Sequence, residues 1–256
     1  MAATTIEWTR GDDGSAGQVW NPVTGCSKVS AGCQHCYAEA LARRFQGAAF
    51  RPWTAPHAAA NVQLHPERLD RPTQWRRPRR IFVNSTSDLF HDQVPDAYLA
   101  RVWAVMAAAP QHQYQVLTKR PVRMRDWLAQ HHPEPLPHVW CGTSVEQRRW
   151  VDARVGALAA TPAGIRFLSC EPLLGPLDLR RWLATGAIHW VIVGGESGPG
   201  ARPMAPAWVR ALRDQCAAAG VAFFFKQWGG SRPGGVAELD GRVYQEWPRP
   251  LEGVRR

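Results

Sequence analysis

The feature that most constrains this chain is a regular alternation of short apolar runs with longer amphipathic segments. Seven runs rich in β-branched and aromatic residues, each bounded by polar or turn-forming residues, predict buried strands. These runs cover residues 18–23, 80–84, 114–118, 138–142, 165–170, 189–194 and 221–226. Amphipathic patterns between them predict helices over residues 37–45, 96–109, 122–130, 146–159, 177–184 and 207–219.

Strands that alternate with helices are typical of βαβ units, which build a parallel sheet through right-handed crossovers. Such a sheet forms either a barrel or an open, doubly wound layer. No G-x-G-x-x-G sequence follows the first predicted strand, which disfavours an open dinucleotide-binding sheet. We therefore expect an α/β fold, a partial (β/α) TIM-like barrel with parallel strands, over residues 1–230. Residues 231–256 would form a C-terminal extension.

The composition of the chain limits the cellular compartment and the kinds of binding partner that we expect. No segment approaches the roughly 20 apolar residues that span a bilayer, and the N-terminus lacks the basic flank and apolar run of a signal peptide. We expect a cytoplasmic protein with no membrane contact, in which the six cysteines stay reduced. The formal net charge of +10 attracts polyanions, so a nucleic acid or nucleotide is a candidate partner.

Nearly every predicted strand ends in polar or reactive residues. Because barrels build their active sites at the carboxyl ends of strands, these ends predict one shared pocket. For any single strand end, a polar cap of the next helix is an equally good explanation. The strand ends supply Asn84, Ser85, Asp88, Lys119, Arg120, Ser144, Glu146, Cys170, Glu171, Glu196 and Lys226.

Three cysteines within eleven residues carry the most specific signal in the chain. Cys26, Cys33 and Cys36 follow the first predicted strand, in a loop over residues 25–37 that also contains two glycines. Three thiolates can hold three irons of a [4Fe–4S] cluster and leave the fourth iron open to a cofactor or substrate. The alternative is zinc in a closed tetrahedral site, with a nearby histidine as the fourth ligand.

The other three cysteines have different predicted surroundings. Cys216 shares an apolar helix face with Trp208 and Leu212, and Cys141 lies within a strand, so neither is expected to bind metal. Cys170 stands at a strand end beside Glu171 and is a candidate catalytic residue.

Several short motifs follow one another in order between about residue 5 and residue 230. They are IEW at 6–8, WNP at 20–22, GC at 25–26 and 32–33, CYA at 36–38, SCEPLLG at 169–175, GGESG at 194–198, ARP at 201–203 and FKQWG at 225–229. Together they resemble the phage-associated three-Cys-motif protein family, which is itself similar to radical S-adenosylmethionine enzymes. The first gap between the cysteines, six residues, is longer than the usual spacing of that superfamily.

The resemblance implies an iron–sulfur enzyme in which a [4Fe–4S] cluster and S-adenosyl-L-methionine generate a 5′-deoxyadenosyl radical that abstracts hydrogen from an anionic substrate. Cys26, Cys33 and Cys36 would hold the cluster. The candidates for the methionine end of the cofactor are Asn84, Ser85 and Asp88, and those for its ribose are Ser144, Glu146 and Glu196. The candidate catalytic residues are Lys119, Cys170, Glu171 and Lys226, and those for the substrate are Arg120 and Arg202.

An arginine-rich segment, residues 71–80, precedes the second predicted strand. Its arginines suit phosphate contacts and Trp75 suits base stacking, although a solvated connecting loop explains the same composition. The residues expected to contribute most to nucleic-acid binding are Arg76, Arg77, Arg79 and Arg80. The rival function from another class is therefore a zinc-stabilised nucleic-acid-binding protein without redox chemistry.

Overall fold

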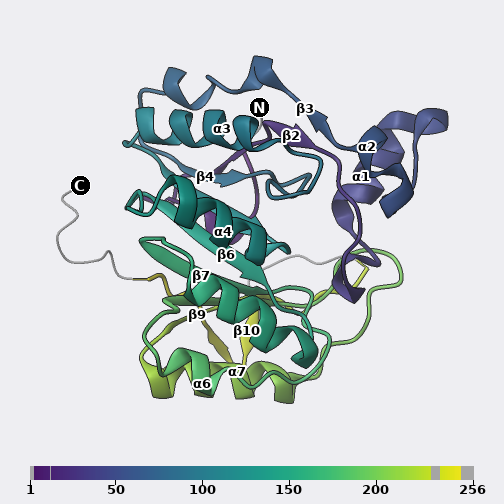
Figure 1. Cartoon of the computed structure of the whole chain (residues 1–256). Coiled ribbons are helices and arrows are strands. Elements are labelled where there is room, and N and C mark those ends of the chain that lie inside the picture. Colours follow the sequence, from purple (N-terminus) through teal and green to yellow (C-terminus); the bar gives the residue numbers. More distant parts are fainter. Residues whose placement is uncertain (1–2, 12, 232–236, 249–256) are drawn as a thin grey trace.

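The computed structural model of the chain describes residues 3–11, 13–231 and 237–248. Its centre is a sheet of seven parallel strands in sequential order, curved into a half-barrel (Figure 1). The strands are β1 (Gln18–Trp20), β4 (Arg80–Val83), β5 (Gln113–Thr118), β6 (Val139–Ser144), β7 (Ile165–Cys170), β8 (Trp190–Gly194) and β9 (Ala222–Gln227). The seven predicted strands and the partial parallel α/β barrel are confirmed.

Helices that follow the strands cover the outer side of this sheet, whereas α1 and α2 stand apart in a projection on the right of Figure 1. The α-helices are α1 (Tyr37–Gln46), α2 (Ala58–Asn61), α3 (Asp96–Ala108), α4 (Pro121–His131), α5 (Gly156–Ala159), α6 (Arg180–Leu183) and α7 (Pro206–Ala219). Helix α7 has Pro206 in its first turn, where the missing N–H costs nothing, and ends at Gly220 with a φ of 66°.

Shorter elements connect these strands and helices. The two-residue strands are β2 (Val23–Thr24), which pairs with β3 (Gln63–Leu64), and β10 (Glu238–Leu239), which pairs with β11 (Arg242–Val243). The 3₁₀ turns are η1 (Glu7–Thr9), η2 (Ala31–Cys33), η3 (Gly47–Ala49), η4 (Ala55–His57), η5 (Pro66–Arg68), η6 (Pro72–Gln74) and η7 (Arg148–Trp150). A π-helical segment, η8 (Val151–Val155), joins η7 to α5.

The helix predicted over residues 146–159 is helical from residue 148 onward, but it is not a regular α-helix throughout. The chain instead forms a 3₁₀ turn, a π-helical turn and one short α-helix in succession. Within this stretch the Arg154 guanidinium turns inward and donates to the Ser144 carbonyl and to the Glu146 carboxylate, each at 2.8 Å. The amphipathic pattern in the sequence identifies the face that packs on the sheet. It does not distinguish a π-helical turn from a regular α-helical turn.

Two apolar layers lie on the two faces of the sheet because successive side chains of a strand point to opposite sides. The outer layer packs between the sheet and the helices and contains Ile81, Val83 and Leu168. The inner layer fills the half-barrel and contains Phe82 and Phe167. This alternation decides which residues near a strand end face the interior.

Segments from both ends of the chain close the half-barrel. The Trp8 ring in η1 lies 4.8 Å from the Phe82 ring, and Gln115 donates to the Trp8 carbonyl at 3.1 Å. Near the other end, the Trp247 ring lies 4.9 Å from the Trp190 ring. The described part of the predicted extension, residues 237–248, therefore packs on the sheet, while residues 232–236 and 249–256 lie outside the described residues.

Across the described ranges, no helix is both long enough and apolar enough to cross a membrane.

Candidate active site

Two adjoining cavities open at the carboxyl ends of the strands, as expected for a barrel active site. The first, here called the cysteine cavity, is lined by all three loop cysteines together with residues that follow β4 and β5. The second, here called the inner cavity, is lined by residues that follow β7, β8 and β9. The cavities share lining from Cys36, Tyr37, Phe82, Leu117, Lys119 and Ser144.

The structure brings most of the predicted site residues to these two cavities. The cysteine cavity contains Cys26, Cys33, Cys36, Asn84, Ser85, Asp88, Lys119, Arg120 and Ser144. The inner cavity contains Glu171, Glu196 and Lys226 in addition to the shared residues. Glu146, Cys170 and Arg202 line neither cavity.

The loop that carries the cysteines is held to the sheet by its backbone. Gly25 donates its N–H to the Thr86 carbonyl at 3.1 Å and adopts a φ of 80°, which favours glycine. A Cβ at this position would lie 1.8 Å from the Asn61 carbonyl oxygen, so no larger residue fits without a backbone shift. Cys33 ends η2, and Cys36 directly precedes α1. The loop is thereby curled over the cysteine cavity.

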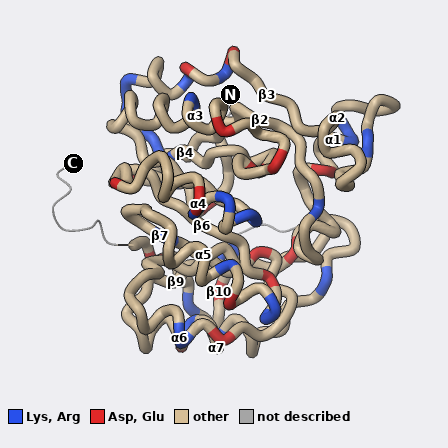
Figure 2. The backbone as a smooth tube through the Cα atoms, in the orientation of Figure 1, with Lys and Arg blue, Asp and Glu red and all other residues tan. Residues whose placement is uncertain are grey.

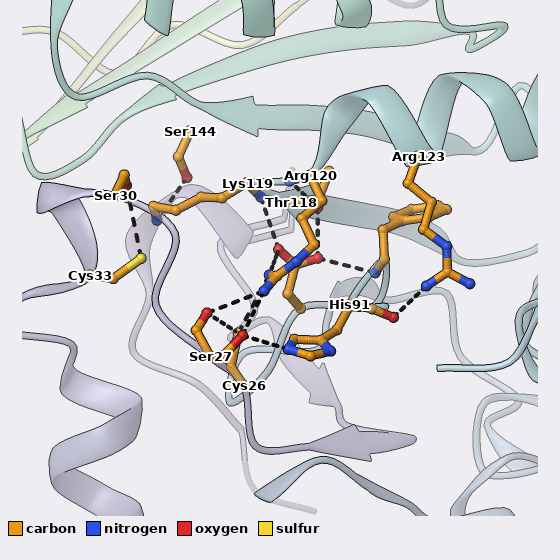
Figure 3. Close-up of polar contacts among 12 residues, drawn as sticks. Cys26, Ser27, Ser30, Cys33, His91, Thr118, Lys119, Arg120, Arg123 and Ser144 are labelled. Atoms are coloured by element: carbon orange, nitrogen blue, oxygen red, sulfur yellow. Dashed lines mark hydrogen bonds and ion pairs between the residues drawn. The ribbon is translucent and has the colours of Figure 1, made fainter. Parts of the chain in front are cut away.

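Arg120, at the end of β5, is the centre of the polar contacts around this loop (Figure 3). Its guanidinium lies 3.6 Å from the Cys26 Sγ and 3.1 Å from the Asp88 carboxylate. It also donates to the Ser27 carbonyl at 3.2 Å and to the Ser27 hydroxyl at 3.1 Å. A planar guanidinium can satisfy several acceptors at once, so this side chain fixes the start of the cysteine loop.

Asp88 is fully engaged by donors of the protein. One carboxylate oxygen accepts from the Thr118 hydroxyl at 2.6 Å and from the Phe90 N–H at 3.0 Å. The other accepts from the Lys119 N–H at 3.0 Å and from Arg120. Asp88, predicted to meet the cofactor, thus positions Arg120 and the end of β5.

Asn84 lines the cysteine cavity and has a buried hydrogen-bond donor without a partner among the described residues. It is buried, adopts a φ of 60°, and accepts from the Val23 N–H at 3.4 Å. Its side-chain N–H₂ group is buried and has no hydrogen-bond partner in the described structure. Since buried polar groups are almost always paired, this amide is the strongest indication that the cavity receives a ligand.

The cysteine thiols sit in partly buried surroundings. Burial raises the pKa of the Cys26 thiol to about 12; the Asp88 carboxylate adds to this and the Arg120 charge opposes it. Burial also raises the pKa of the Cys36 thiol, against hydrogen bonds from the Glu39 and Ala38 backbone. Cys33 lies 3.9 Å from the Ser30 hydroxyl.

The inner cavity combines an apolar floor with an ion pair. Ile6, Trp8 and Phe82 supply the floor. Above it, the Lys226 ammonium lies 2.9 Å from the Glu171 carboxylate, which also accepts from the Ser169 hydroxyl at 3.2 Å. Both charged side chains are partly buried, so they are shielded from bulk water and can still contact a ligand in the cavity.

Lys119 lies between the two cavities. Its ammonium donates to the Ser144 hydroxyl at 3.3 Å, and both residues line both cavities. A cation at this junction can contact groups bound on either side.

Comparison with protein-family models relates this chain to one described family. The model described as "Protein of unknown function (DUF5131)" matches residues 3–248. The chain belongs to this family. Its DUF5131 match covers the whole half-barrel and the residues that line both cavities. No curated protein and no solved structure matches the chain.

In this DUF5131 protein, Glu196 and Arg202 tie two distant loops together. The Arg202 guanidinium forms a two-point ion pair with the Glu196 carboxylate, with Nε at 2.8 Å from one oxygen. It also donates to the Ala31 carbonyl at 2.9 Å and to the Gln34 side chain at 3.3 Å. Both residues were predicted to bind ligands, but the structure places Arg202 as a clamp on the cysteine loop.

Glu146 lies behind the cavities in a buried ion pair with Arg154, at 2.8 Å. One of its carboxylate oxygens is buried without a partner. A Cβ on Gly32 would lie 3.0 Å from the Glu146 side chain, so the glycine lets the cysteine loop approach this carboxylate closely. The predicted contact of Glu146 with a ribose is therefore not provided by the cavity lining.

Cys170 belongs to the core of the DUF5131 protein, and the structure does not support a catalytic role for it. Its side chain is completely buried in the outer layer, where burial raises the pKa of the thiol well above its ordinary value. Its neighbours Ser169 and Glu171 point the other way and line the inner cavity. The alternation of side chains along β7 causes this difference.

The three loop thiols share one cavity, but they are not drawn together around a single point. Among the described residues, no group of three or more His, Cys, Asp or Glu side chains is arranged to hold a metal ion. Metal binding by Cys26, Cys33 and Cys36 thus remains a prediction.

Sequence reasoning missed several residues of the site. Ser27 bonds both Arg120 and His91, whose ring nitrogen lies 2.8 Å from its hydroxyl. Tyr37, which donates its hydroxyl hydrogen to the Ser85 carbonyl, lines both cavities. Adjacency to Cys26 and Cys36 was the signal that could have indicated Ser27 and Tyr37, whereas His91 had none.

The arginine-rich segment lies away from the cavities, at the amino end of β4. Arg80 is buried, its guanidinium donates to Gln113 and to the Arg10 carbonyl, and it lies 4.2 Å from the centre of the Trp247 ring. Arg80 is therefore a structural residue, and the prediction that it contacts nucleic acid is wrong because its side chain is buried. Arg76 and Arg77 are exposed.

Proposed function

We propose that this DUF5131 protein is an iron–sulfur enzyme of the radical S-adenosylmethionine type. The observation that carries the proposal is that three loop cysteines line one cavity at the carboxyl ends of parallel strands, joined to a second cavity that contains a partly buried ion pair. The resemblance to the phage-associated three-Cys-motif family supports the same assignment. The core cysteines take no part in it.

The residues of the cysteine cavity suit a cluster and its cofactor in their chemistry. Cys26, Cys33 and Cys36 would supply the thiolates, which are the usual ligands of such clusters. The unpartnered Asn84 amide would donate to the cofactor. Arg120 already points its guanidinium at the Cys26 sulfur, and donors of this kind orient and tune ligands from outside the metal site.

When bound, a [4Fe–4S] cluster with S-adenosylmethionine supplies a 5′-deoxyadenosyl radical that removes a hydrogen atom from the substrate. The chain's own residues bind and orient the reactants. Lys119 and Lys226 would hold anionic groups of the substrate, and Glu171 would accept a hydrogen bond from it. The apolar floor of Ile6, Trp8 and Phe82 would keep water from the inner cavity.

Anaerobic reconstitution with iron and sulfide tests the proposal. We expect a brown protein with broad absorbance near about 400 nm, as thiolate-bound clusters give, and release of 5′-deoxyadenosine once S-adenosylmethionine and a reductant are added. A colourless protein that binds zinc and releases no 5′-deoxyadenosine would contradict the proposal and favour the zinc-stabilised binding protein.

A further inference from the structure

We infer that the substrate of this site is a single-stranded nucleic acid, bound in an outer groove beside α1. The inference rests on the proposed function, because it names the substrate class of the same site. It is carried by three observations: the connection of the groove to the cavities, its charge, and the exposed apolar side chains of α1, of which Tyr37 and Leu41 line the groove and Phe45 lies one helical turn beyond Leu41.

The outer groove is continuous with the two cavities. It runs between α1 and the loop at residues 197–199, with Arg43, Arg44 and Pro52 along its sides. Cys36 and Tyr37 line the groove, the cysteine cavity and the inner cavity alike. A chain lying in the groove can therefore direct one of its units past Tyr37 into the inner cavity.

The groove carries positive charge that other side chains do not neutralise. Its acidic lining residue in the described structure, Glu39, is buried and forms an ion pair with Lys28 at 2.7 Å. Arg43 and Arg44 are exposed, and neither has an ion-pair partner among the described residues. Figure 2 shows blue basic segments on the projection that contains α1. Unpaired arginines beside a groove attract a phosphate chain.

Exposed apolar side chains lie along α1 beside these arginines. Tyr37, Leu41 and Phe45 follow one another at intervals of four residues and therefore share one face of the helix. The Phe45 side chain is 80% exposed and Tyr37 is 51% exposed. The hydroxyl of Tyr37 is held by the Ser85 carbonyl, so its ring is fixed in place. Rings presented in this way offer stacking surfaces for bases.

These rings favour a single strand over a duplex. Bases in a duplex are already stacked and paired, whereas unpaired bases can lie on aromatic side chains. A partner protein would also cover an apolar stripe, but it would leave the two arginines unused unless it were acidic. The groove leads to a reaction cavity and has Arg43, Arg44 and the Tyr37 ring in its lining, with the Phe45 ring farther along the same helix face, and this combination points to a single-stranded polynucleotide.

Fluorescence anisotropy with a labelled oligothymidylate of about 16 nucleotides tests the inference, with oligouridylate and a duplex of equal length as comparisons. We expect the single strands to bind at low salt and the duplex to bind more weakly. The double variant R43Q/R44Q should lower the slope of log K against log salt by about 1.4, since each contact with a single strand contributes about 0.7. F45A should weaken binding roughly tenfold, within the range of one stacked base.

The matched control is R76Q/R77Q, which removes two exposed arginines from the opposite end of the sheet. Composition alone predicts that these two arginines bind nucleic acid, but because they lie far from the groove, the inference expects R76Q/R77Q to leave affinity and salt slope unchanged. All five altered side chains are exposed, so equal urea midpoints of the variants and the parent chain show that folding is intact. Absence of single-strand binding at low salt, or an equal loss in R43Q/R44Q and R76Q/R77Q, overturns the inference.

The same samples separate the two proposals. A chain that holds iron and sulfide but binds no oligonucleotide overturns the groove assignment and leaves the enzyme proposal standing. A chain that binds single strands through Arg43 and Arg44 but never holds a cluster overturns the enzyme proposal and supports the groove as a binding site.

Discussion

Two groups of three cysteines occupy opposite environments in this half-barrel. Those of the cysteine loop are partly exposed and share a cavity with a guanidinium and an unpartnered amide. Cys141, Cys170 and Cys216 are buried among the apolar side chains of the outer layer. Burial raises the pKa of thiols in both groups, to about 12 for Cys26 as well as for Cys141 and Cys216, so the groups differ in their polar contacts and their access to a cavity and not in pKa.

The difference shows that the surroundings of a thiol, more than its residue type, decide what it can do. A buried thiol in an apolar layer behaves as a small hydrophobic side chain. A thiol in a polar loop over a cavity can be deprotonated when it binds a metal ion. Hydrogen-bond donors near the sulfur stabilise the thiolate, and the cavity leaves room for the metal. The expected consequences of changing each group are therefore opposite.

The largest expected effect is on catalysis. Replacing Cys33 by Ala should reduce 5′-deoxyadenosine release to background, because the cluster would lose one of its three ligands. Cys216→Ala should release it at the rate of the parent chain. The comparison fails if the two variants lose activity to the same extent.

A second effect concerns folding stability. Cys216→Ser places a hydroxyl in the apolar outer layer and should lower the free energy of unfolding by about 1–3 kcal/mol. Cys33→Ser, in the partly exposed loop, should change it by less than about 0.5 kcal/mol. Urea unfolding of the metal-free proteins measures both. A larger loss for Cys33→Ser would mean that the loop thiols are structural.

The smallest expected effect comes from the guanidinium beside Cys26. Arg120→Lys keeps the charge near Asp88 but cannot reach all of its acceptors, so a chelator should remove iron about tenfold more readily. Arg125→Lys is the matched control, since Arg125 pairs only with the exposed Asp126 among the described residues. Equal iron loss from both variants would show that Arg120 does not help to hold the iron.

The fold could be predicted from the sequence because its strands are marked locally. Each buried strand is a short apolar run between turn-forming residues, and the order of the runs determines the parallel topology. The closure of the half-barrel could not be predicted in this way. Trp8 and Trp247 reach its interior from segments that have no strand or helix pattern of their own.

The site was predictable where it depends on strand ends and less so where it depends on pairing. Asn84, Lys119 and Glu171 directly follow strands and Lys226 lies near the end of β9, and the parallel sheet brings all four to the two cavities. The link from Arg202 to the Ala31 carbonyl spans 171 residues of sequence, and no local pattern reports it. Cys170 could have been placed correctly from alternation, because Phe167 and Ser169 face inward and the next residue must face outward.

The most direct test of the central claim is to count iron and acid-labile sulfide per chain after anaerobic reconstitution, in the parent and in the triple variant C26A/C33A/C36A. The account predicts about four of each in the parent, the same in Cys216→Ala, and almost none in the triple variant. A triple variant that keeps the iron and sulfide of the parent would contradict the claim that these three cysteines hold a cluster.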